Sequence, residues 1–144
     1  MLIRKMLSIL CLAFATAILV PVLHADQANQ ATKVTFSQPV QVPGKTLPAG
    51  TYYMQLLPNL GSKGIVQIFD EQHEFIATFF TVTRERQEPT GRSTFVLADK
   101  GEGHAEAIVA WFYPGRTDGH EFLYPKPERQ ELARVQTQTV VAGD

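Results

Sequence analysis

Cysteine is almost absent from this sequence, because Cys11 is the only one among 144 residues. It lies in an apolar run that we expect to be removed, so the working protein would contain no thiol. That excludes a disulfide, a cysteine nucleophile and a thiolate metal site. Small exported domains often depend on disulfides, and this one must therefore be held together by its hydrophobic core.

An excess of charge of either sign is also lacking, since 13 Lys and Arg stand against 14 Asp and Glu. Without the two basic residues at positions 4 and 5, 11 remain, and the net charge becomes −3. A surface with no basic bias offers little attraction to a phosphate backbone. We therefore expect no nucleic-acid partner.

The N-terminal segment has the layout of an export signal. A basic pair at positions 4 and 5 precedes the apolar run Met6–Val20, and the small residue Ala25 follows shortly afterwards. These are the features of a secretory signal peptide. We predict a signal over residues 1–25, with Ala28 as a second cleavage position, and a secreted or periplasmic protein. The alternative is an uncleaved membrane anchor over Leu7–Leu23, which alone would bring the protein to a membrane.

Beyond residue 25 the sequence predicts strands separated by turn signals. We expect a flexible lead-in over 26–32, a single β-domain over 33–135 and a C-terminal tail over 136–144. Short segments rich in apolar, aromatic and β-branched residues cover 33–42, 51–57, 64–69, 75–84, 94–98 and 107–113. Short strands with turns between them predict an all-β fold, an antiparallel β-sandwich or small barrel of about six to eight strands.

Three segments allow finer predictions. Pro39 cannot donate to a ladder, so residues 33–42 should form an edge strand or two short pieces. The polar stretch Asp70–His73 should close a hairpin between its neighbouring strands. Apolar residues face both ways along Phe75–Arg84, so we expect its middle, including Phe80, to be buried on both sides.

The C-terminal region changes character. Good helix formers follow a proline over Pro127–Val135, which predicts one short surface helix. The last residues, Gln136–Asp144, should form either a frayed tail or an added edge strand.

A search for catalytic chemistry finds little. No Gly-x-Ser-x-Gly turn presents a nucleophile, and Ser62 in Gly61–Gly64 fits a hairpin loop better than a serine–lysine pair. Imidazole and carboxylate groups on two segments could converge on a metal, which needs three or four such ligands, but their spacing matches no compact motif: Glu102, His104, Glu106, His120 and Glu121. We predict no cofactor and no catalytic residue.

Aromatic residues near the C-terminus form the best candidate surface. Aromatic rings with polar groups between them can stack on sugars or anchor a protein partner. The candidate binding residues are Trp111, Tyr113, Arg116, His120 and Tyr124. The alternative is that Trp111, Phe112 and Phe122 are core residues and that Pro114–Gly119 is a rigid loop.

Three segments carry a family resemblance: Phe36–Tyr52, Trp111–Gly115 and Glu121–Lys126. Together they resemble small exported proteins of unknown function from Acidobacteria-type soil bacteria. The resemblance implies a location in the bacterial envelope, and it supplies no catalytic residues.

Two functional hypotheses follow. The first is a non-enzymatic binding or assembly module of the cell envelope, which engages a protein partner, a carbohydrate or a second copy. Sheet edges at Val34–Val42 or Gln136–Val141 would allow strand addition. The second is a metal-dependent or carbohydrate-active envelope enzyme that uses the loop histidines and carboxylates.

Overall fold

The computed structural model describes residues 30–57 and 64–142. The predicted signal peptide, both cleavage positions, most of the lead-in and the loop residue Ser62 lie outside these described residues. Within them, no helix has the length and apolar character needed to cross a membrane.

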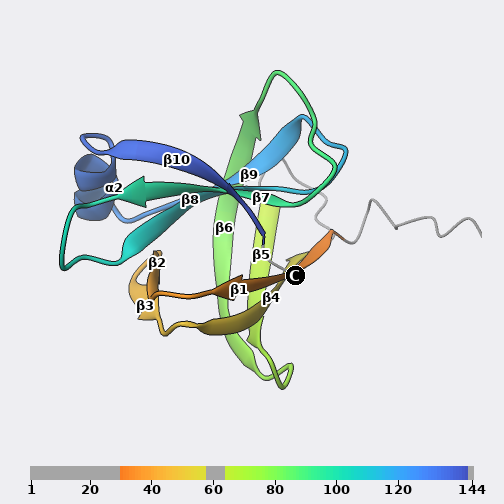
Figure 1. Ribbon diagram of the computed structural model, residues 1–144, viewed down its shortest axis with the longest axis horizontal. Helices are drawn as coiled ribbons and strands as arrows, with labels where there is room; N and C mark the ends of the chain where they lie inside the picture. Colours follow the sequence, from red (N-terminus) through yellow and green to blue (C-terminus); the bar gives the residue numbers. More distant parts are fainter. Residues whose placement is uncertain (1–29, 58–63, 143–144) are drawn as a thin grey trace, which may run out of the picture.

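The described chain is mostly β-structure, with one short helix near its C-terminal end (Figure 1). The strands are β1 (Ala31–Phe36), β2 (Val40–Val42), β3 (Lys45–Leu47), β4 (Gly50–Leu57), β5 (Gly64–Asp70), β6 (Phe75–Glu85), β7 (Thr94–Asp99), β8 (Glu106–Phe112), β9 (Asp118–Phe122) and β10 (Gln136–Val141), and the helix is α2 (Lys126–Leu132). The all-β class and the helix predicted from the sequence are confirmed.

All ten strands belong to one mixed sheet. Its main path runs β1-β4-β5-β6-β9-β8-β2-β3, and β7 joins the other side of β8 and carries β10. Every pair is antiparallel except β2 with β8. The strand number exceeds the prediction because β3, β9 and β10 were not counted as strands of the domain.

The sheet curls back over itself without closing. Strand β1 pairs only with β4 and β10 only with β7 among the described strands. Even so, the Phe36 ring of β1 meets the Phe95 ring of β7 edge-on, with centroids 5.9 Å apart. The core lies between these facing parts of the sheet and includes the fully buried Trp111.

Period-two alternation explains why the first strands form. In β1, Val34 and Phe36 point into the core while Lys33 and Thr35 are exposed, as expected for a strand with one solvated face. Pro39 separates β1 from β2, which is the two-piece arrangement predicted. The hairpin between β5 and β6 is also confirmed.

The prediction that the middle of β6 is buried on both sides was wrong. Phe79 and Thr81 face the core, but Phe80 is 58% exposed. Apolar residues that alternate with other apolar residues do not reveal which face is covered. The sheet leaves the outer face of β6 open to solvent at Phe80.

The segment expected to be a loop beyond Tyr113 contains a central strand. Strand β9 pairs with β6 on one side and β8 on the other. The predicted rigid loop Pro114–Gly119 therefore ends inside β9. The domain limits also shift, because β1 begins at Ala31 and the predicted tail contains β10, the edge-strand alternative.

Candidate functional site: the open seam of the sheet

Some backbone N–H and C=O groups of β1 make no hydrogen bond to β4. The Leu56 N–H donates to the Gln30 carbonyl over 2.7 Å, and the next pair in the register is Ala31 with Gln55. Hydrogen-bonded pairs alternate along an antiparallel ladder. The N–H and C=O groups of Ala31, Lys33 and Thr35 therefore point away from β4, along a free edge.

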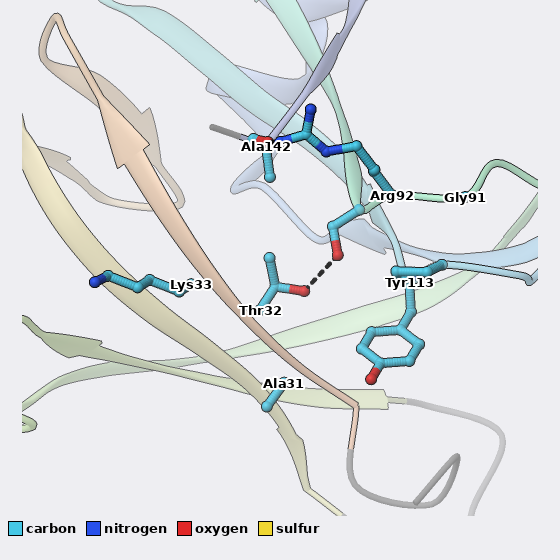
Figure 2. Close-up of a pocket in the computed structure, with 9 residues that line it drawn as sticks. Ala31, Thr32, Lys33, Gly91, Arg92, Tyr113 and Ala142 are labelled. Atoms are coloured by element: carbon cyan, nitrogen blue, oxygen red, sulfur yellow. Dashed lines mark hydrogen bonds between the residues drawn. The ribbon is translucent and has the colours of Figure 1, made fainter. Parts of the chain in front are cut away.

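A pocket of about 330 Å³ opens beside the first half of this edge (Figure 2). Ala31–Lys33 form one wall. The other walls come from Gly91–Ser93 before β7, Tyr113 and Pro114 after β8, and Ala142 after β10. We call this gap between β1 and the ends of β7, β8 and β10 the seam, and its cavity the seam pocket.

Side-chain hydrogen bonds hold the seam together where no ladder does. The hydroxyls of Thr32 and Ser93 lie 2.7 Å apart, the contact dashed in Figure 2. The Trp111 indole N–H donates to the Thr32 hydroxyl over 3.2 Å. These bonds fix β1 against β7 and β8 but leave its edge unpaired.

Two basic residues, Lys33 and Arg92, are among the residues that line the seam pocket. Arg92 donates to the Ala142 carbonyl over 3.0 Å, so its guanidinium is held by the chain itself. The Lys33 ammonium lies 5.8 Å from the centre of the Tyr53 ring, and its side chain points away from the pocket (Figure 2). Because Lys33 lies in the middle of the free edge of β1, its charge would lie opposite a residue of any strand added there.

The predicted exposed aromatic surface is not present. Trp111 is fully buried and Tyr124 is only 6% exposed. The Tyr124 hydroxyl donates to the Ile108 carbonyl over 2.8 Å, and burial, with a smaller effect of Glu128, raises the pKa of Tyr124. Phe112 and Phe122 are also buried, so the core alternative describes these rings.

Arg116 is paired within its own turn. Its guanidinium donates to both carboxylate oxygens of Asp118, over 2.8 and 2.7 Å. These hydrogen bonds lower the pKa of Asp118 and raise that of Arg116. A guanidinium already bound in this bidentate way has fewer donors left for a ligand.

His120 lies in β9 with its ring beside Trp111, at 5.5 Å between centroids. Its Nε2 is 3.0 Å from the Gln30 Oε1, so Nε2 carries the proton in this arrangement. Burial lowers the pKa of His120; Asp118 acts in the opposite direction and Arg116 in the same one. The ring is therefore a largely neutral group inside the fold, where it helps to fix the start of β1.

Tyr113 is the one predicted binding residue that lines the seam pocket. Sequence reasoning missed its neighbours Thr32, Lys33, Arg92 and Ser93, because the segments that supply them are about 60 residues apart, as in the Thr32–Ser93 contact with a separation of 61. A free edge over Val34–Val42 was predicted. Strand β1 does end the sheet, but β2 is paired on both sides, with β3 and β8.

The residues proposed as metal ligands do not converge. Glu102 and His104 lie in the connection before β8, whereas His120 lies within β9. Among the described residues, no three His, Cys, Asp or Glu side chains are arranged to hold a metal ion.

These features define a small all-β domain whose single sheet remains open at the seam. The chain belongs to the family described as "Protein of unknown function (DUF2911)", whose model matches residues 24–100. The match covers β1 to β7, and so it includes the seam residues Thr32 and Ser93 but not those after β8 and β10. No curated protein and no solved structure matches the chain.

Proposed function

We propose that this protein is a non-enzymatic binding module, exported to the cell envelope of an Acidobacteria-type bacterium, that takes an extended peptide into the seam. The observation that carries the proposal is the free edge of β1 beside the seam pocket. The N-terminal export pattern supports the location, and the separated histidines and carboxylates give no support to a metal enzyme.

Backbone pairing would supply the affinity. Ala31, Lys33 and Thr35 each offer an N–H and a C=O to a strand laid along the edge. Strand addition of this kind draws affinity from main-chain hydrogen bonds, while pockets for alternate side chains give specificity. Each such bond contributes about 0.5–1.5 kcal/mol net. The Tyr113 ring is an amphipathic contact beside the same edge.

Charge restricts the class of peptide. Lys33 is exposed in the middle of the free edge of β1, so we propose an extended segment that places an acidic side chain opposite Lys33. Neutralising Lys33 as Lys33→Gln should weaken such a peptide and reduce the effect of salt on its binding. Lys45→Gln, at the exposed start of β3, is the matched control and should change neither.

The test uses peptides selected on the protein from a display library of short random sequences. Selected peptides should be acidic and extended. Ala31→Pro should weaken their binding about tenfold, because proline removes an N–H that points away from β4 and its ring narrows the seam pocket. Thr139→Pro, which removes an outward N–H from the β10 edge, should leave their affinity unchanged. A library that yields no binder, or binders equally affected by both variants, would contradict the proposal.

A further inference from the structure

Strand β10 is an edge strand in which nearly every side chain is exposed. Five of its six residues are exposed, and the sixth, Val140, is half-buried against the core. The Ala142 N–H bonds to the Ser93 carbonyl, and the register continues as Val141 with Thr94. By the alternation of an antiparallel ladder, Thr137, Thr139 and Val141 direct their N–H and C=O groups away from β7.

The other free edges carry the protections that discourage pairing. Strand β1 places Lys33 in the middle of its edge, and β3 has only three residues, begins at Lys45 and is followed by Pro48. Lysine, proline and short length are common ways of blocking an edge. Strand β10 has six residues without a charge, a proline or a glycine, and its Val141 is 52% exposed.

We infer that β10 is an interface between two copies of this chain, which pair antiparallel along this edge. A two-fold axis at Thr139 is the arrangement in which all three outward residues find partners, with Thr137 opposite Val141 and Thr139 opposite Thr139. The pairing brings no like charges together and covers Val141. Thr–Thr and Thr–Val neighbours across strands are favourable, and two-fold dimers are the commonest oligomers.

A second copy fits this edge better than the edge of β1, where the same symmetric pairing would set Lys33 against Lys33. Pairing along a single six-residue edge buries little surface compared with the roughly 1,200–2,000 Å² of a standard stable interface. The dimer is therefore a reversible one that depends on protein concentration. It uses an edge outside the seam pocket, so it does not depend on the proposed peptide binding.

The first measurement is analytical ultracentrifugation of the protein exported with its own N-terminal sequence, over a concentration series from micromolar to millimolar. The average mass should rise from that of one chain towards that of two. Thr139→Pro and Thr139→Lys should each abolish the rise, the first by removing a donor and the second by opposing two lysines. Ala31→Pro should leave it intact. Circular dichroism melting establishes that each variant is folded.

Amide hydrogen exchange on the unmodified protein gives an independent readout. Exchange at Thr137, Thr139 and Val141 should slow as concentration rises, whereas Gln138 and Val140, already bonded to β7, should change little. A constant single-chain mass up to millimolar concentration overturns the inference. So does a dimer that survives both Thr139 variants, or one that Ala31→Pro disrupts. Loss of peptide binding with an intact dimer, or the reverse, separates this inference from the proposed function.

Discussion

The indole N–H of Trp111 donates to the hydroxyl of Thr32 over 3.2 Å, although the two residues are 79 positions apart and their strands share no ladder. Thr32 is also bonded to Ser93, so one hydroxyl joins β1 to both β7 and β8. Where the sheet is open, buried side chains take over the role of the missing backbone pairing.

Thr32→Val should therefore lower the free energy of unfolding by about 1–3 kcal/mol, the cost of leaving buried polar groups unpaired. The indole N–H and the Ser93 hydroxyl would both lose their partner. Urea unfolding measures the change. Thr35→Val, which breaks only the exposed bond to Thr51, should cost less than about 0.5 kcal/mol, and Thr32→Ser should recover most of the loss. Equal stability of both valine variants would refute this role.

Gly119 in β9 is held against the ring of Phe112. A Cβ at this position would lie 2.4 Å from Phe112 Cδ1. The ring cannot easily retreat, because it is buried and Arg86 stacks over it at 4.6 Å. Gly119→Ala should reduce the free energy of unfolding by about 1–3 kcal/mol, as overpacking does. Gly91→Ala, with nothing within 4 Å of the added carbon, is the control that should melt with the unmodified protein.

His120 should make stability depend on pH in a defined direction. Its pKa in the folded protein is lowered by burial, so below the unfolded value of about 6.5 the unfolded chain binds more protons. The stabilisation is complete above that value and is lost as the pH falls from about 6.5 towards the folded pKa. Urea midpoints at pH 7.5 and 5.5 should differ more for the unmodified protein than for His120→Gln.

His104→Gln is the matched control for that measurement, because the His104 side chain is exposed. It should keep the full difference between the two pH values. If His120→Gln keeps it as well, the pH dependence comes from another group.

The mature protein should begin at Asp26. The basic pair, the apolar run and the small residue at position 25 predict cleavage there. Mass spectrometry of the protein purified from a bacterial host measures the N-terminal residue directly. A first residue at Asn29 would point to the second cleavage position, and retention of Met1 would favour the anchor alternative.

The sequence was most informative where one face of a strand meets the core. Val34 and Phe36 of β1 alternate with polar residues, and they were predicted to share one face of a strand. Strand β9 was missed because Asp118-Gly119 has the composition of a turn, and only its neighbours β6 and β8 make it a strand. The exposure of Phe80 was not predicted, because an apolar side chain does not show whether another element covers its face of the strand.

The candidate site shows the same limit. The edge character of β1 could be inferred from Pro39 and local alternation. The pocket beside it could not, since its walls meet only after the sheet has curled. Trp111 and Tyr124 were proposed as ligand-facing because an aromatic cluster has the same composition on a surface as in a core.

The segment that matches the family model does not contain all the strands that complete the sheet. The family match ends at residue 100, yet β6 receives its neighbour β9 from beyond that point, and β7 receives both β8 and β10. A chain cut at the family boundary would leave β7 without either of its strand partners, β8 and β10. During synthesis, the core can therefore be completed only after the strands beyond residue 100 have been made.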